Sequence, residues 1–156
     1  MPNASHSGDP SNGSGPVLVF DGGCPFCRHF AERSEIAGGI SGLQICDGRS
    51  DAALRHQLAQ RGYHLRSGAM VLDGDRVLHG AEAIEWLCSR MHPSDALLTL
   101  LVPLFSSPVR SRALYPLLLS ARALALRLRR LPIDPDRADR ASTAAMAAIT
   151  EASPRC

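Results

Sequence analysis

The chain has 156 residues, 45% of them hydrophobic, and a formal net charge of +2. This length suits one domain of roughly 100–150 residues with tails, and the small net charge gives no reason to expect an acidic partner. All 17 basic residues are arginines and only 4% of the residues are aromatic. A nucleic-acid-binding surface needs a basic stripe interleaved with aromatic side chains, so we predict no nucleic-acid partner.

The two ends of the chain are expected to lie outside the packed domain. Residues 1–16 are rich in Ser, Gly, Asn and Pro and bury too little apolar surface to offset the entropy lost on ordering. Residues 132–156 are rich in alanine and predict either a helix or a weakly ordered tail. No charged segment followed by an apolar run opens the sequence, which favours a cytoplasmic protein, where disulfides are usually transient or catalytic.

The first predicted elements lie in the segment VLVFDGGCPFCRHF, residues 17–30. Val17–Phe20 is apolar at every position and is followed by Gly-Gly, which predicts a strand covered on both faces and central in its sheet. A helix is predicted to begin at Pro25, because proline lacks the N–H that would be unpaired in a first helical turn. The inward face of this helix is expected to carry Phe26, Cys27, Phe30 and Ala31.

The next elements continue an alternating pattern. A strand is predicted at Leu43–Cys46, followed by a helix at 51–61 that Asp51 caps. A hairpin of Ala69–Leu72 and Arg76–His79 comes next, and a third helix is predicted at 81–91. The resulting order, β-α-β-α-β-β-α, implies parallel pairing in its first half. It is the element order of a thioredoxin-like α/β domain, with a four-stranded mixed sheet and flanking helices, which we assign to residues 17–92.

Two apolar stretches follow this core, at Ala96–Phe105 and Ala113–Leu128. Neither reaches the ~20 uninterrupted apolar residues of a membrane span, since the first is short and the second contains Arg122 and Arg127. We predict helices that pack on the domain as an extension over residues 93–131. The alternative is peripheral membrane contact, with the arginines facing anionic lipid.

Cys24 and Cys27 lie three residues apart at the start of the first predicted helix. Unpaired backbone N–H groups and the helix dipole stabilise an anion there, and such positions lower a cysteine pKa from ~8.5 to as little as ~3.5–7.5. The spacing brings both sulfurs within disulfide reach. We therefore predict a dithiol–disulfide pair in which Cys24 is exposed and attacks, while Cys27 is more buried, harder to ionise and resolving. We predict no cofactor and no metal.

The same segment resembles the opening of the thiol-disulfide oxidoreductase DCC family, whose motif is D-x-x-C-x-x-C. Asp21, Cys24 and Cys27 match its three letters, and Gly22 and Pro25 match common family choices. Looser similarities extend to residue 130 and involve Gly80, Ala83, Pro103, Tyr115 and Arg122. The resemblance implies a thioredoxin-like fold and dithiol–disulfide exchange with a protein or a low-molecular-weight thiol or disulfide.

The role of Asp21 has two interpretations. Its carboxylate either relays a proton to a buried sulfur during exchange or caps backbone N–H groups before the helix. Its negative charge would raise the pKa of Cys24, so it is not expected to activate that thiol by charge.

Thioredoxin-like proteins place a proline before the hairpin, but the segment HLRSGAMVL has none, and Ser67-Gly68 is a candidate replacement. The predicted substrate groove comprises Gly22, Gly23, Pro25, Phe26, Ser67 and Gly68.

Two other functions remain open at this point. One is a zinc site, which would combine the cysteine pair with two of Cys46, Cys88, His29 and His64. Structural zinc usually needs two closely spaced ligand pairs, and the sequence has only one. The other is a redox-inert interaction module on the same fold. Without a metal, Cys46 and Cys88 are predicted to be core residues, and His29 either assists thiolate formation or is solvated. The oligomeric state is not predicted.

Overall fold

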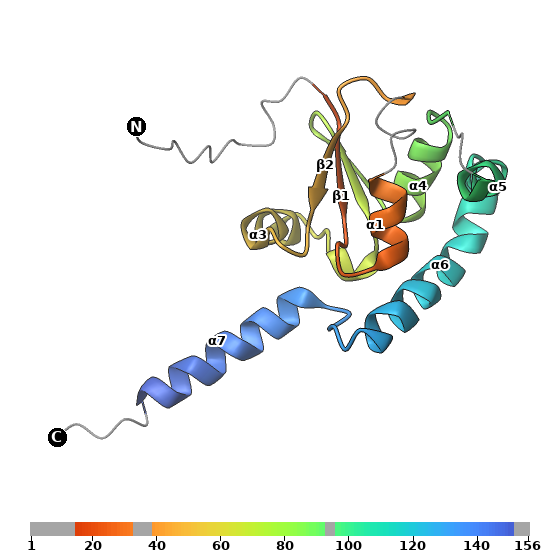
Figure 1. Ribbon diagram of the computed structural model, residues 1–156. Helices are drawn as coiled ribbons and strands as arrows, with labels where there is room; N and C mark the ends of the chain where they lie inside the picture. Colours follow the sequence, from red (N-terminus) through yellow and green to blue (C-terminus); the bar gives the residue numbers. More distant parts are fainter. Residues whose placement is uncertain (1–14, 33–38, 93–95, 152–156) are drawn as a thin grey trace, which may run out of the picture.

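The computed structural model describes residues 15–32, 39–92 and 96–151. Most of the predicted N-terminal tail, residues 1–14, therefore lies outside the described residues. Figure 1 shows the elements, which in chain order are β1 Val17–Phe20, α1 Pro25–Ala31, β2 Gln44–Asp47, α3 Ala52–Gln60, the short 3-10 turn η2 Leu65–Ser67, β3 Met70–Asp73, β4 Arg76–His79, α4 Ala81–Cys88, α5 Ala96–Phe105, α6 Pro108–Leu128 and α7 Pro135–Glu151.

The four strands form one mixed sheet in the order β2-β1-β3-β4. Strand β1 is parallel to β2, with Val17 opposite Gln44, and antiparallel to β3, with Val17 opposite Leu72. Strands β3 and β4 form the predicted antiparallel hairpin. The predicted four-stranded mixed sheet is thus confirmed, and so is the central position of β1.

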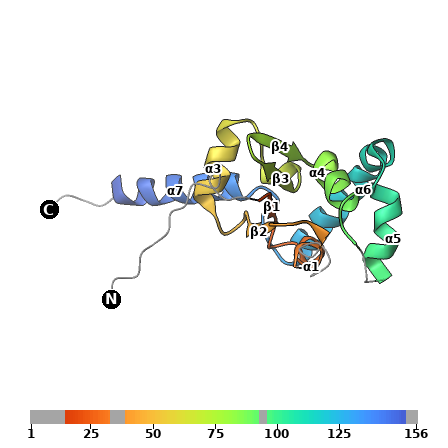
Figure 2. The same cartoon turned by 90° about the horizontal axis from the view of Figure 1, so that it is seen from above.

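Strand β1 is apolar throughout because both of its faces are buried. Leu18 and Phe20 belong to a core cluster on the face covered by α1, α4 and α5. Val17 and Val19 belong to a second cluster on the opposite face, where Leu54 and Leu58 of α3 pack. Successive side chains of a strand point to opposite faces, so one four-residue strand contributes to both cores. Figure 2 shows α3 on the other side of the sheet from α1.

One predicted helix start is confirmed and another is wrong. The Asp51 side chain accepts a hydrogen bond from Leu54 N–H (2.9 Å), so the predicted cap of α3 is present. Helix α6 begins at Pro108, five residues before the predicted start at Ala113. Proline is favoured in the first turn of a helix, where its missing N–H has no partner to lose.

Helices α5 and α6 pack against α4, and α6 also reaches α1. Two hydrogen bonds hold the first half of α6, from Ser111 Oγ to the Ala81 carbonyl (2.8 Å) and from the Tyr115 hydroxyl to the Ser67 carbonyl (3.0 Å). None of the helices among the described residues combines the length and the apolar character needed to cross a bilayer. Peripheral membrane contact, the alternative to packing on the domain, is not tested by this finding.

The C-terminal segment forms a helix over Pro135–Glu151, one of the two outcomes predicted for it. In both views α7 extends away from the body of the molecule (Figures 1 and 2). Its first turns are attached to α3 through Arg55, which pairs with Asp136 and Asp139. The connection from α6 to α7 consequently passes close to the end of β1.

Candidate functional site

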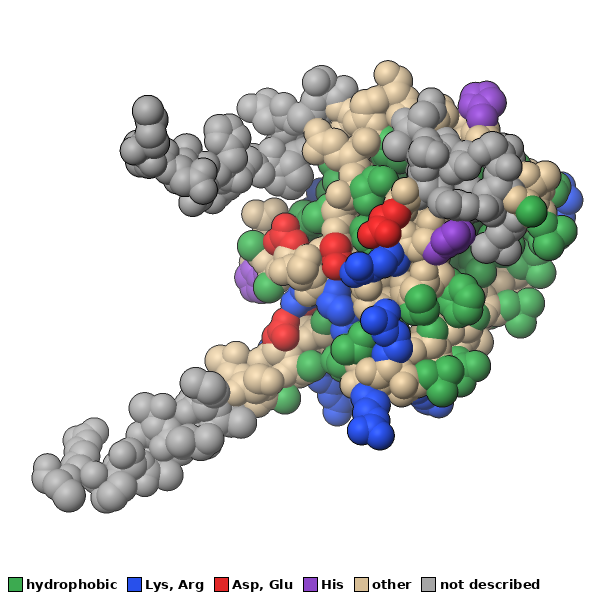
Figure 3. Space-filling view, viewed as in Figure 1, with side chains coloured by type: hydrophobic (Ala, Val, Ile, Leu, Met, Phe, Trp, Pro, Cys, Tyr) green, Lys and Arg blue, Asp and Glu red, His purple; other side chains and the backbone are tan. Residues whose placement is uncertain are grey.

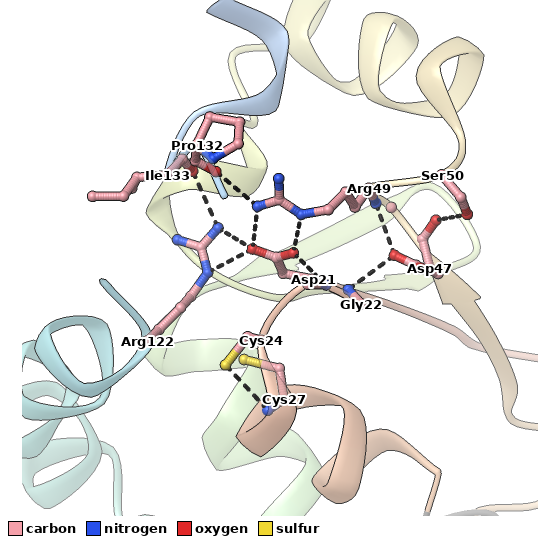
Figure 4. Close-up of polar contacts among 12 residues, drawn as sticks. Asp21, Gly22, Cys24, Cys27, Asp47, Arg49, Ser50, Arg122, Pro132 and Ile133 are labelled. Atoms are coloured by element: carbon pink, nitrogen blue, oxygen red, sulfur yellow. Dashed lines mark hydrogen bonds and ion pairs between the residues drawn. The ribbon is translucent and has the colours of Figure 1, made fainter. Parts of the chain in front are cut away.

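The residues 21–24, here called the redox loop, join the end of β1 to the start of α1. Cys24 is the N-cap of α1, with extended backbone angles, and its sulfur accepts a hydrogen bond from Cys27 N–H at 3.4 Å. Pro25 follows in the first helical turn, as predicted. The two thiols therefore lie together at a strand-to-helix junction, and both are free in this structure (Figure 4).

The predicted difference in exposure between the two cysteines is wrong. Cys24 is 0% exposed, whereas Cys27 is only half-buried. The prediction assumed that the N-terminus of α1 faces solvent. In the structure α6 and the segment after it approach the redox loop, and Arg129 Nη1 donates to the Gly23 carbonyl at 3.1 Å. A helix distant in sequence thus covers the helix start.

The two thiols nevertheless differ strongly in ionisation. A hydrogen bond from the Cys27 thiol, helped by the N–H groups of Cys27 and Phe26, lowers the pKa of Cys24 to about 6, although burial and the Asp21 charge oppose this. The same hydrogen bond, together with burial and the charge of the Cys24 thiolate, raises the pKa of Cys27. Cys24 is therefore the more readily ionised of the two thiols.

Asp21 is held by a network of arginines (Figure 4). Asp21 is 3% exposed. Its carboxylate accepts hydrogen bonds from Arg49 Nε at 2.6 Å and from Arg122 Nε at 3.0 Å. A second nitrogen of each arginine also donates to it. Gly23 N–H donates to the same carboxylate at 3.0 Å. Burial alone would raise the pKa of Asp21, but the hydrogen bonds and charges of Arg49 and Arg122 lower it.

This arrangement favours one interpretation of Asp21 over the other. The backbone cap is present in the bond from Gly23 N–H. A carboxylate with a lowered pKa holds no proton near neutral pH and is a poor relay, and its charge raises the pKa of Cys24, as predicted. Asp21 is therefore best described as a residue that positions the redox loop.

The glycines of the redox loop make close contacts with neighbouring side chains. Gly22 N–H donates to Asp47 Oδ1 at 2.9 Å, and a Cβ at Gly22 would lie 2.0 Å from that carboxylate. A Cβ at Gly23 would lie 2.6 Å from Arg49 Nε. The side chain of Arg28 also donates to the Gly22 carbonyl, at 3.1 Å. Polar groups from β2, α1 and the segment after β2 thus fix this backbone.

The predicted groove residues Ser67 and Gly68 face a side chain of α6. Tyr115 donates to the Ser67 carbonyl, and a Cβ at Gly68 would lie 1.5 Å from the Tyr115 hydroxyl oxygen. Gly68 also has a positive φ of 130°, which favours glycine. The backbone at Ser67 and Gly68 thus packs closely against Tyr115, and its role as a replacement for the proline stays a prediction.

The remaining predicted site residues divide between wall and core. Phe26 was expected on the inward face of α1, but it is 63% exposed and contributes to the edge of a cavity that Cys24 and Cys27 also line. Pro25 and His29 are exposed members of the same wall. Cys88 is buried, which raises its pKa to about 12, and Cys46 is half-buried. Within the described ranges, no cluster of three His, Cys, Asp or Glu residues is placed to hold a metal ion.

Comparison with known families agrees with this geometry. The family model of the DCC1-like thiol-disulfide oxidoreductases matches residues 18–128. The chain belongs to this family. The match includes the redox loop, the sheet and α6, and so all of the residues that contact Asp21 through side chains. Searches of curated proteins and of solved structures found no match.

Membership of the DCC1-like family accounts for the cysteine pair, while the arginine network was largely missed from the sequence. Arg122 was noted only as part of a loose resemblance, and Arg49 was not singled out. With all 17 basic residues being arginine, nothing in composition marks these two. One signal in the sequence could have indicated a cationic partner. A single aspartate, Asp21, lies between a buried strand and two glycines, and a carboxylate that is buried there needs a cationic partner.

Proposed function

We propose that this DCC1-like protein is a thiol-disulfide oxidoreductase in which Cys24 attacks and Cys27 resolves. The observation that carries the proposal is the asymmetric pair: Cys24 with a pKa lowered to about 6 and Cys27 with a raised pKa, joined by a hydrogen bond at the start of α1. The thiolate is the nucleophile in exchange. The substrate is a protein or low-molecular-weight disulfide, or a thiol in the reverse direction.

In the reductive direction the Cys24 thiolate attacks one sulfur of the substrate disulfide. A mixed disulfide forms, and the first substrate thiolate leaves and takes up a proton. Cys27 then loses its proton and attacks the Cys24 sulfur, which forms the Cys24–Cys27 disulfide and releases the second substrate thiol. One disulfide is reduced for one dithiol oxidised. Of the two protons on the product thiols, one comes from Cys27 and the other from solvent, which earlier took up the proton of Cys24.

Part of what raises the pKa of Cys27 is removed before the second step. The largest cause is the hydrogen bond to Cys24, followed by burial and then by the charge of the Cys24 thiolate. The hydrogen bond and the thiolate charge depend on Cys24 being an anion, and they vanish once Cys24 is part of a mixed disulfide. Burial and the charge of Asp21 remain, opposed by the positive charge of Arg122. Cys27 therefore becomes easier to ionise at the step in which it must attack.

The test is to trap the mixed disulfide in a lysate with two matched variants. Cys27→Ser retains the attacking thiol and is expected to accumulate adducts, whereas Cys24→Ser is expected to form almost none. After alkylation, the two are compared on non-reducing gels. Equal trapping, or trapping by Cys24→Ser alone, would overturn the assignment of roles. Equilibration of the wild-type pair with glutathione buffers would give its reduction potential, which in C-x-x-C proteins spans roughly −120 to −270 mV.

A further inference from the structure

A cavity of about 600 Å³ lies beside the cysteine pair, open on one side and lined by residues of α1, the sheet and the helices α4 to α6. Its wall is almost entirely apolar and includes Phe30, Leu87, Leu101, Phe105 and Leu118. The volume is within the ~300–1,000 Å³ of typical small-molecule sites. An apolar cavity holds water poorly and binds apolar molecules instead. The size and the wall both point to an apolar occupant.

Two of the polar side chains in this wall, Tyr115 and Arg122, are already engaged, and His29 lies at an exposed position. The Tyr115 hydroxyl donates to the Ser67 carbonyl, and Arg122 is paired with Asp21. None of the described residues in the wall carries a carboxylate. A charged disulfide such as glutathione disulfide would leave water for a site that has no carboxylate to pair with its ammonium groups. The one guanidinium in the wall, that of Arg122, is already paired with Asp21, so burial of the glutathione carboxylates is unfavourable as well.

The position of Cys24 restricts the shape of the substrate as well. Cys24 is 0% exposed, yet it forms part of the cavity wall with Cys27. A substrate sulfur must therefore approach the pair from the cavity, whose wall holds the half-buried Cys27 and the covered Cys24. A narrow molecule with its sulfur at the end of a flexible chain meets this requirement, while a disulfide on the surface of a folded protein does not.

Resting on the proposed function, we propose that the cavity binds the substrate, and that this substrate is a low-molecular-weight disulfide or dithiol with an uncharged aliphatic body. The disulfide lies against Cys24 and Cys27, and the aliphatic chain lies among the apolar side chains of α5 and α6. The exchange is the two-step reaction described above, in which the substrate disulfide becomes two thiols while the protein dithiol becomes a disulfide. No further oxidant or reductant enters this single turnover.

The surface around the cavity fits the same substrate class. Phe26, at the edge of the cavity, is 63% exposed and offers an aromatic face to a molecule entering. Hydrophobic side chains also gather on the side of the molecule formed by α5 and α6 (Figure 3). These surfaces favour approach by an apolar molecule over a charged one.

The first experiment measures binding without chemistry. A Cys24→Ser/Cys27→Ser protein is titrated by calorimetry with butanamide, hexanamide and octanamide, which are uncharged and contain no sulfur. Burial of methylene groups predicts affinity that increases roughly two- to fourfold per added CH₂. Affinity that does not change with chain length, or no binding of octanamide, would overturn the proposal.

The second experiment measures single turnovers of the reduced wild-type protein. Lipoamide, a cyclic disulfide on an aliphatic chain, is compared with hydroxyethyl disulfide and glutathione disulfide, each rate being divided by the rate with free dithiothreitol. We expect the normalised rate to be at least tenfold higher for lipoamide than for glutathione disulfide. Octanamide should inhibit the lipoamide reaction competitively. A higher normalised rate for glutathione disulfide, or for a peptide disulfide with polar flanking residues, contradicts the proposal.

Matched variants link these effects to the cavity. Leu118→Gln places an amide in the wall and should weaken octanamide binding and lipoamide turnover at least fivefold. Leu117→Gln is the control, because Leu117 is on the same helix but 67% exposed and not in the wall. If Leu118→Gln does not fold, Ala121→Gln replaces it as the wall variant, because Ala121 lies at an exposed position of the wall. Equal effects of the wall and control variants would contradict the proposal.

The two proposals fail in different ways. If none of the disulfides reacts while the amides bind with the expected dependence on chain length, the proposed redox function is wrong and the apolar cavity site stands. If hydroxyethyl disulfide reacts and the amides do not bind, the redox function stands and the cavity is not the substrate site.

Discussion

Arg122 on α6 donates two hydrogen bonds to the carboxylate of Asp21 at the end of β1, and the two residues are 101 positions apart in the chain. Both are buried, at 5% and 3% exposure. The pair fastens α6 to the redox loop, three residues from Cys24. Stability and redox chemistry therefore depend on the same contact.

We expect Arg122→Met to lower the free energy of unfolding by about 3–5 kcal/mol, because it leaves a buried carboxylate with only one of its two cationic partners. Urea denaturation measures this. Arg127→Met on the same helix is the control, since Arg127 is exposed and its loss should change stability by no more than ~0.5 kcal/mol.

A double-mutant cycle separates the ion pair from the packing of the Arg122 side chain. Asp21→Asn removes the charge that Arg122 neutralises, so Asp21→Asn/Arg122→Met should be less destabilised than the sum of the single variants, with a coupling of ~0.5–3 kcal/mol. Strictly additive effects would show that the pair contributes nothing beyond packing.

The rate of alkylation of Cys24 by iodoacetamide should titrate with a midpoint near its pKa of about 6. Because the Cys27 thiol is the largest cause of that low value, Cys27→Ala should move the midpoint upward. Cys27→Ser is the matched comparison, since its hydroxyl can still donate, and its midpoint should lie between the other two. Mass spectrometry of the alkylated Cys24 peptide follows each protein, and one midpoint common to all three would refute the hydrogen-bond explanation.

The low pKa of Cys24 also makes stability depend on pH. Its pKa is about 6 in the folded protein, below its ordinary value of 9.0, so between these values the unfolded chain holds a proton that the folded protein lacks. The free energy of unfolding of the dithiol form should therefore rise from pH 6 to pH 9, and the contribution is lost as the pH falls through 6. Urea denaturation under reducing conditions should show a smaller rise for Cys24→Ser. Parallel profiles for the two proteins would contradict this.

The contact between Gly68 and Tyr115 predicts a rescue. Gly68→Ala should be strongly destabilising, because its Cβ would lie 1.5 Å from the Tyr115 hydroxyl oxygen at a φ of 130°. Tyr115→Phe alone removes one hydrogen bond, worth ~0.5–1.5 kcal/mol. In the double variant the missing oxygen relieves part of the clash, so its destabilisation should be less than the sum.

Gly62→Ala is the control for Gly68→Ala in thermal or urea unfolding. Gly62 also has a positive φ, 85°, but a Cβ there would meet no atom within 4 Å. Only the strain of the left-handed conformation remains, ~1–2 kcal/mol. If both alanine variants lose the same stability, the clash with Tyr115 is not the cause.

Features determined by neighbouring residues could be predicted from the sequence. Val17–Phe20 is apolar at every position, and this placed β1 in the centre of the sheet correctly. The Asp-Gly turn placed the β3–β4 hairpin, and Pro25 after Cys24 placed the thiols at a helix start. Each of these signals acts over a few residues, where backbone geometry and side-chain chemistry are linked directly.

Features determined by distant contacts could not be predicted in this way. The contacts around the redox loop involve α6, which begins more than 80 positions after Cys24. The two partners of Asp21, Arg49 and Arg122, are among 17 arginines. No periodicity relates Asp21 to Arg49 or Arg122, because their meeting depends on how the sheet and the last helices assemble. The same holds for the cavity, whose wall combines side chains from β1, α1, α4, α5 and α6.

The separation of Asp21 from Arg122 has a consequence for the order of events during synthesis. At ~5–20 residues per second, the 101 positions between them correspond to roughly 5–20 s. For that time the nascent chain carries both cysteines without the arginine that anchors the carboxylate beside them, and without the helix that covers Cys24. The redox centre is thus encoded near the beginning of the chain but matures only after α6 has left the ribosome, and its thiols are most open to unwanted oxidation before then.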